Sequence, residues 1–96
     1  MMFYLVTYDV SDPRALRRTA KLLNTFGTRV QKSVFECHLT ASQFAHLRRR
    51  IEEERDRAPA GTPYSVRCYR LGQFPPERLV IVGEGEHTTL SPHLIV

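Results

Sequence analysis

The apolar residues of this chain of 96 residues fall into short runs with two different spacings. Residues 3–9 form a continuous run rich in β-branched and aromatic side chains, which is typical of a strand covered on both faces. Later runs follow either helical spacing or the alternating spacing of a strand. The pattern predicts a strand at 3–9, a helix at 13–26, an extended segment at 29–39, a helix at 41–56, and strands at 64–71 and 78–83.

The extended segment changes phase part-way along its length. Val30 and Val34 share one face of a strand, whereas Phe35, Cys37 and Leu39 share the other. A bend near Val34 and Phe35 would cause this change and divide the segment into two strands. The order then becomes βαββαβ, and we expect an α+β, ferredoxin-like sandwich with both helices on one face of an antiparallel sheet.

The apolar strand at 78–83 is surplus to a four-stranded sheet. Pairing with a second copy of the chain would bury it, and a domain this small has a marginal core that oligomerisation would strengthen. We therefore expect a homodimer. Residues 1–83 are expected to form one domain that includes this C-terminal edge strand, and residues 84–96 a C-terminal tail.

Local signals mark the ends of both predicted helices. Asp12 is a favoured N-cap and Pro13 suits the first helical position, while Gly27 stands where a left-handed C-cap residue would end the helix. Thr40 and Gln43 form a candidate capping box at the start of the second helix. These signals support the helix boundaries given by the apolar pattern.

A stripe of basic residues follows one face of the first helix. Its members are Arg14, Arg17, Arg18 and Lys21. No acidic residue lies between residues 13 and 32, and like charges at these spacings repel, so we expect a partner outside the helix. A solvated face is the alternative, but such faces usually mix both signs of charge. A phosphate-binding face is therefore favoured.

The second predicted helix carries charges of both signs. Arg48, Arg49 and Arg50 each precede a glutamate by four residues, so these six charges can pair along the helix. We expect an ordinary exposed face here. The excess of positive charge then belongs mainly to the first helix and to Arg29 and Lys32 after it.

Asp9 ends the first predicted strand. An ionised carboxylate in a buried setting is costly unless it is paired or binds a metal ion, so this is a candidate functional residue. Asp is also a common turn residue, and the start of a turn before the helix is the alternative. The four histidines are scattered without metal-ligand spacing, and Cys37 and Cys68 are expected to be buried, reduced thiols.

Several segments taken together resemble the CRISPR-associated Cas-two family. They are Tyr8-Asp9-Val10, the Arg-rich first helix ending at Phe26-Gly27, the run Arg-Val-Gln-Lys-Ser-Val-Phe-Glu at 29–36, and the strands at 66–71 and 79–83. The resemblance implies a ferredoxin-like homodimer that acts with the Cas-one integrase in spacer acquisition and holds a DNA fragment. Members are also described as metal-dependent endonucleases that act on single-stranded RNA or double-stranded DNA.

The resemblance also implies roles for single residues. The family's metal-binding acid corresponds to Asp9, with Tyr8 beside it at the dimer seam as a second catalytic residue. Mg²⁺ or Mn²⁺ would be the cofactor, and two copies of Asp9 across a twofold axis would supply carboxylates that one chain lacks. The expected nucleic-acid-binding set combines the motif with the basic residues: Arg14, Arg17, Arg18, Lys21, Arg29, Lys32, Ser33 and Phe35.

Three functions therefore compete. The first is a metal-dependent phosphodiesterase centred on Asp9, the second a non-catalytic DNA-binding adaptor that bridges integrase subunits, and the third a toxin-like ribonuclease of the same fold. A formal net charge of +4 agrees with DNA or RNA as a partner. Because the chain has no signal peptide and no apolar run of membrane length, we expect a cytoplasmic protein without a membrane partner.

Overall fold

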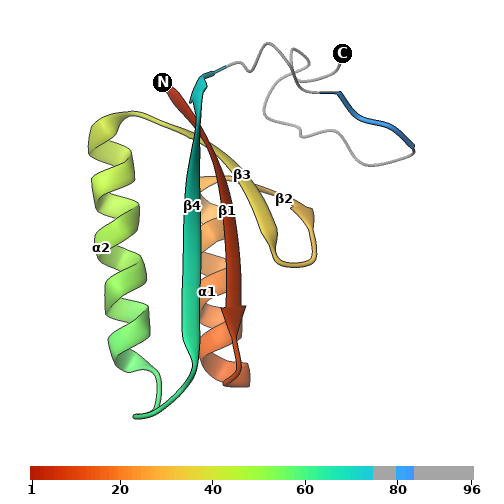
Figure 1. Ribbon diagram of the computed structural model, residues 1–96. Helices are drawn as coiled ribbons and strands as arrows, with labels where there is room; N and C mark the ends of the chain where they lie inside the picture. Colours follow the sequence, from red (N-terminus) through yellow and green to blue (C-terminus); the bar gives the residue numbers. More distant parts are fainter. Residues whose placement is uncertain (75–79, 84–96) are drawn as a thin grey trace.

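A computed structural model describes residues 1–74 and 80–83 of the chain. The elements follow the order βαββαβ (Figure 1). Their bounds are β1 (Met2–Val10), α1 (Pro13–Phe26), β2 (Thr28–Gln31), β3 (Val34–Leu39), α2 (Ala41–Arg57) and β4 (Tyr64–Gln73). The predicted α+β, ferredoxin-like fold is confirmed.

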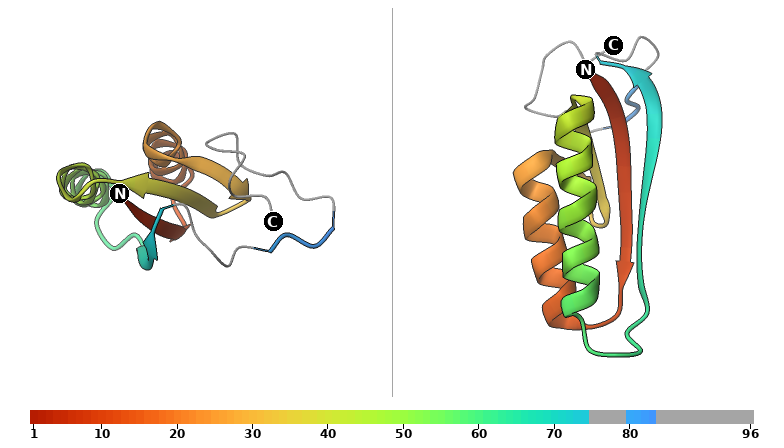
Figure 2. Two further views of the ribbon diagram at one scale, coloured as in Figure 1. Left: turned by 90° about the horizontal axis from the view of Figure 1, so that it is seen from above. Right: turned by 90° about the vertical axis from the view of Figure 1, so that its left-hand side faces the viewer.

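The strands form one antiparallel sheet in the order β2-β3-β1-β4. Both helices pack on the same face of this sheet, so the fold has one helix layer and one strand layer (Figure 2). In this order β4 is an edge strand, and one of its sides has no partner strand among the described residues. No helix in the described part of the chain is long and apolar enough to cross a membrane.

Alternate residues of β1 point to opposite faces of the sheet. Those that join the core beneath the helices are Tyr4, Val6, Tyr8 and Val10. Residues between them point to the face without helices, which we call the open sheet face; Leu5 and Asp9 lie there, opposite Tyr69 and Ser65 of β4. The expectation that this strand is covered on both faces is therefore wrong for a single chain, because both helices pack on one side.

The extended segment divides into β2 and β3, as predicted, but the turn lies at Lys32 and Ser33, before the expected bend at Val34 and Phe35. Tyr8 holds this turn against β1. Its backbone N–H donates to the Ser33 carbonyl at 3.2 Å, and its hydroxyl donates to the Lys32 carbonyl at 3.1 Å. These contacts fix the position of the turn against β1.

The predicted N-caps of both helices are present. The Asp12 carboxylate accepts a hydrogen bond from the Ala15 backbone N–H at 2.9 Å, and Pro13 opens α1. Thr40 and Gln43 make both bonds of a capping box at the start of α2, at 3.1 and 2.8 Å. The two helices therefore begin where their local sequence specifies.

The predicted strand at 78–83 lies partly outside the described residues. Residues 80–83 form no strand in the single chain, and Val80 and Val82 are 66% and 92% exposed. Among the described residues the sheet therefore has four strands, and residues 80–83 do not add a fifth. Pairing of 78–83 with a second copy stays a prediction, and the predicted tail at 84–96 lies outside the described residues.

Candidate nucleic-acid interface

The basic stripe lies on the surface of the helix layer. Helix α1 places Arg14, Arg17 and Lys21 with exposed side chains. Within residues 1–74 and 80–83 none of these three forms an ion pair, whereas the acidic residues of α2 are engaged by nearby arginines. Three of the four predicted phosphate-binding residues of α1 are therefore available to a ligand.

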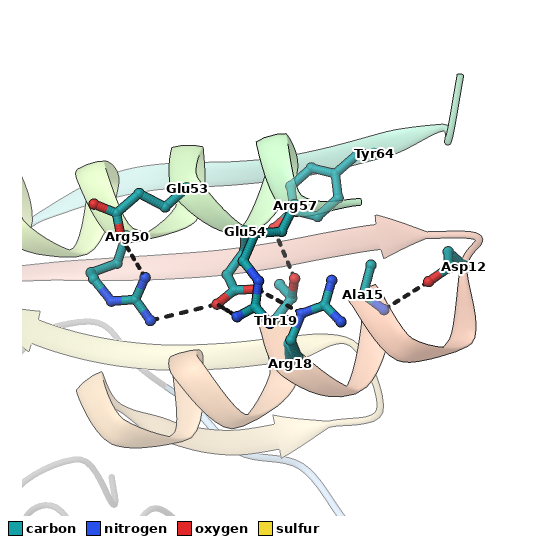
Figure 3. A network of polar contacts seen from close by, with 9 residues as sticks. All are labelled: Asp12, Ala15, Arg18, Thr19, Arg50, Glu53, Glu54, Arg57 and Tyr64. Atoms are coloured by element: carbon teal, nitrogen blue, oxygen red, sulfur yellow. Dashed lines mark hydrogen bonds and ion pairs between the residues drawn. The ribbon is translucent and has the colours of Figure 1, made fainter. Parts of the chain in front are cut away.

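Arg18 differs from the rest of the stripe because α2 supplies it with a carboxylate. Its Nε donates to Glu54 Oε1 at 2.9 Å (Figure 3). The Glu54 side chain is only 4% exposed, and its other oxygen lies 3.5 Å from Arg50 and 3.6 Å from Arg57. The stripe is thus partly neutralised from outside its own helix, as expected, but by a residue of α2.

This network corrects the expectation that the paired charges of α2 form an ordinary exposed face, because Glu54 is buried. Arg48 does reach Glu52 at 3.4 Å, and Arg50 reaches Glu53 at 2.7 Å, but Glu54 turns toward α1. The sequence contained a signal for this: Glu54 follows Leu47 by seven residues and Ile51 by three, so it shares the apolar face of α2. A carboxylate on that face must find a partner on another element.

Two hollows on the helix layer are lined by basic side chains. One, of about 450 Å³, lies between the helices and is bordered by Lys21, Arg50 and Glu54. The other, of about 470 Å³, lies at the start of α1 and is bordered by Arg14 and Arg17. Arg18 and Arg57 line both hollows. The planar fork of arginine matches the geometry of phosphate oxygens, so these hollows suit phosphate groups.

Tyr8, Arg29 and Phe35 come together on the helix side of the sheet. The Tyr8 hydroxyl accepts a hydrogen bond from Arg29 Nη2 at 3.3 Å, and the Arg29 guanidinium lies 5.3 Å from the centre of the Phe35 ring. Tyr8 is buried, and its hydroxyl also bonds the backbone at Lys32. The geometry gives Tyr8 a structural part in holding the β2–β3 turn.

Asp9 is separated from this group by the sheet itself. It is exposed on the open sheet face, opposite Ser65 of β4. Within the described residues no group of three His, Cys, Asp or Glu side chains could hold a metal ion. Since Mg²⁺ needs a shell of six oxygen ligands, the residues of one chain fit such a site poorly, and a carboxylate from a second copy is required to improve it.

Burial perturbs the pKa values of three groups of β3: it raises those of Glu36 and Cys37 and lowers that of His38. Burial raises the pKa of the Cys37 thiol to about 12. Both cysteines are free thiols, as predicted, but only Cys37 is buried; Cys68 is half-buried. Burial also raises the pKa of Glu36, whose Oε1 has no hydrogen-bond partner among the described residues. Glu36 lies on the open sheet face, since it pairs with Leu5 and stands between the core residues Phe35 and Cys37.

Comparison with known proteins adds to this geometry. The family model described as CRISPR associated protein Cas2 matches residues 2–74. A protein of Chloroflexus aurantiacus named CRISPR-associated endoribonuclease Cas2 3 is 38% identical over 95 residues, which cover 99% of this chain and 98% of that protein.

Solved structures show the same fold. The Streptococcus pyogenes Cas2 crystal structure at pH 6.5 is 41% identical, with a TM-score of 0.62 over 74% of this chain and 87% of that one. A chain of a partial Cas6-RT-Cas1–Cas2 complex is 29% identical, with a TM-score of 0.68 over 75% of this chain and 80% of that one. With its βαββαβ fold and a family match over nearly all the described residues, the chain belongs to the CRISPR associated protein Cas2 family.

Proposed function

We propose that this protein binds the phosphate backbone of DNA or RNA through its helix layer and acts in CRISPR adaptation beside a Cas1-type integrase. The observation that carries this proposal is the exposed basic stripe of Arg14, Arg17 and Lys21, which has no ion pair within the described residues. The similarity to a chain of a Cas1–Cas2 assembly supports the integrase as a partner and favours an adaptor over a toxin-like ribonuclease.

The working unit of this proposal is a homodimer formed through the open sheet face. Tyr69 and Leu71 of β4 are 45% and 53% exposed, and β4 is an edge strand whose free side can pair with another strand. The exposed Val80 and Val82 belong to a segment with strand-like sequence. Pairing of this segment with β4 of a second copy would cover both apolar surfaces.

A second activity, metal-dependent phosphodiester hydrolysis, is supported by the place of Asp9. Because Asp9 is exposed on the open sheet face, contact between two such faces would bring two carboxylates toward one another. Mg²⁺ or Mn²⁺ bound there would lower the pKa of a water molecule and neutralise charge on a phosphate. Relatives that match this chain are named endoribonucleases, which supports phosphodiester hydrolysis as an activity here.

The binding proposal is tested by replacing both Arg14 and Arg17 by Ala. Arg18 is left in place because its removal would also strip a partner from the buried Glu54. Each lost phosphate contact lowers the slope of log affinity against log salt concentration by about 1, so the double variant should lose a slope of about 2 for duplex DNA. Ala preserves the helix, so the melting temperature should change little.

Replacing Arg48 and Arg49 by Ala provides a matched control. It removes two guanidinium groups from α2, but neither residue lines the two basic hollows. We expect binding to the control with nearly the wild-type salt slope. If the Arg14 and Arg17 double variant keeps the wild-type slope, or the control loses as much, nucleic acid does not lie on the α1 stripe.

A further inference from the structure

Helix α2 adds basic side chains to the surface that the α1 stripe begins. Arg50 and Arg57 both turn toward α1, where they approach Glu54 from the two sides (Figure 3). Around this one buried carboxylate the structure gathers three guanidinium groups, so the cluster keeps a surplus of positive charge. The sequence pattern assigned Arg50 and Glu54 to an ordinary exposed face, and that prediction did not include Arg57.

Arg57 is the member of this cluster that is most open to a ligand. Its side chain is 63% exposed, compared with 28% for Arg18 and 35% for Arg50. The distance of 3.6 Å from Arg57 Nη1 to Glu54 Oε2 is too long for a hydrogen bond, so none of the five N–H donors of the guanidinium is engaged by another of the described residues. Glu54 thus orients Arg57 without occupying its donors.

The hollow at the start of α1 places Arg57 beside other basic side chains that can bind the same ligand. Arg57 borders it from α2, and Arg14 and Arg17 border it from α1. The hollow also contains one carboxylate, Asp12, but its Oδ2 already accepts the Ala15 N–H of the helix cap. The net charge of the side chains around the hollow is therefore positive, which favours the binding of an anion.

We infer that Arg57 is a phosphate-contact residue, and that α1 and α2 form a single phosphate-binding surface across the groove between them. This rests on the proposed function, because the ligand is the phosphodiester backbone of a nucleic acid. A polynucleotide is favoured over free phosphate because the two hollows share Arg18 and Arg57 and so form a continuous basic track. Such a track suits a chain of phosphates.

The test compares Arg57→Ala, Arg57→Lys and Arg49→Ala with wild type for binding of fluorescent duplex DNA over a range of salt concentrations. Arg57→Ala should bind about tenfold more weakly at roughly 0.1 M salt and lose a slope of about 1, because one phosphate contact is gone. Arg57→Lys keeps the charge and should keep most of the slope. Arg49 is exposed on α2 but lines neither hollow, so Arg49→Ala should match wild type.

The outcomes separate this inference from the proposed function. If the double Ala variant of Arg14 and Arg17 loses salt slope but Arg57→Ala keeps the wild-type slope, the inference about Arg57 fails and the α1 interface stands. If neither the double variant nor Arg57→Ala changes the salt slope, the inference and the proposed binding function both fail. Inorganic phosphate is added as a competitor: displacement of DNA at millimolar phosphate, with loss of that effect in Arg57→Ala, would indicate a single-phosphate site and overturn the assignment to a polynucleotide. Failure of phosphate to compete supports the polynucleotide.

Discussion

At the scale of single residues, alternation along β1 decides which candidates share a site. Tyr8 and Asp9 are neighbours in sequence, yet Tyr8 is buried under the helices and Asp9 is exposed on the open sheet face. The period of two in a strand was sufficient to predict this separation. The contact of Tyr8 with Arg29 was not predictable in the same way, because it depends on the register of the β2–β3 hairpin.

Gly27 ends α1 as predicted, but for a different physical reason from the predicted one. Its backbone is extended, with φ of −161°, so it is not the left-handed cap that the sequence predicted. A Cβ atom at this position would collide with the Cys37 Sγ and the Glu36 carbonyl oxygen. Glycine is therefore required by the close approach of β3, a tertiary contact that local sequence does not report.

Glu36 leads to a prediction about pH. Burial raises its pKa in the folded protein, so the folded state holds the proton more tightly than the unfolded state does. This contribution to stability is complete below the unfolded pKa, about 4.3, and is lost as the pH rises through the folded pKa. Glu36→Gln removes the charge and should be more stable than wild type at neutral pH, by about 1 kcal/mol.

The measurement is urea unfolding of both proteins from about pH 4 to about pH 8, where a normal glutamate changes from partly protonated to ionised. The gain from Glu36→Gln should grow as the pH rises. Glu53→Gln, at an exposed glutamate of α2, is the control and should show no such trend. A gain that shrinks with rising pH would contradict the assignment of Glu36 as a destabilising buried acid.

At the scale of secondary-structure elements, local signals were enough to place both helices. The predicted helices at 13–26 and 41–56 agree with Pro13–Phe26 and Ala41–Arg57, because caps such as Asp12 and Thr40 act within one turn of the chain. The contact between α1 and α2 through Arg18 and Glu54 was missed. Rules for pairing within one helix cannot predict this contact, because Arg18 and Glu54 are 36 positions apart in the sequence.

This contact predicts that Glu54 holds α2 to α1. Removing one partner of a buried ion pair leaves charge without compensation, and the exposure of Arg50 and Arg57 reduces that cost. We expect Glu54→Ala to lower the free energy of unfolding by about 2 kcal/mol, and Glu54→Gln, which keeps an acceptor for Arg18, to lower it by about 1 kcal/mol. Urea unfolding monitored by circular dichroism gives both values.

Glu53→Ala is the matched control for this prediction. Glu53 pairs with Arg50 at 2.7 Å, but its side chain is 55% exposed, so its loss should cost less than about 0.5 kcal/mol. A double-mutant cycle with Arg18→Ala and Glu54→Ala should give a coupling energy of about 1 kcal/mol or more. Additive effects in that cycle would mean that the two helices are held by apolar packing alone.

At the scale of the whole molecule, the sequence was enough to predict the fold class, but not which residues share the open sheet face. The order of elements and the change of phase at 29–39 predicted βαββαβ, which the structure confirms. Alternation along β1 separates Asp9 from Tyr8, but only the pairing of β1 with β4 shows that Asp9 and Tyr69 lie on the same face. That face is where the proposed dimer and the proposed metal site coincide.

We predict that Asp9→Asn abolishes cleavage but leaves dimer assembly and DNA binding unchanged. Asn keeps the shape of the side chain but removes the charge that would hold Mg²⁺ or Mn²⁺. Because Asp9 is exposed, the free energy of unfolding should change by less than about 0.5 kcal/mol, and duplex DNA should bind with an unchanged salt slope through α1. Cleavage of single-stranded RNA or duplex DNA should fall to the level that wild type shows in EDTA.

Asp56→Asn is the control, since it removes an exposed carboxylate from α2, away from the open sheet face. It should cleave like wild type, and sedimentation should show dimers for wild type and both variants. Metal-dependent cleavage that persists in folded Asp9→Asn would exclude Asp9 as the metal ligand. Wild-type protein that binds DNA but cleaves neither substrate would exclude the nuclease and leave the binding role, because the α1 stripe and Asp9 lie on opposite faces of the sheet and act independently.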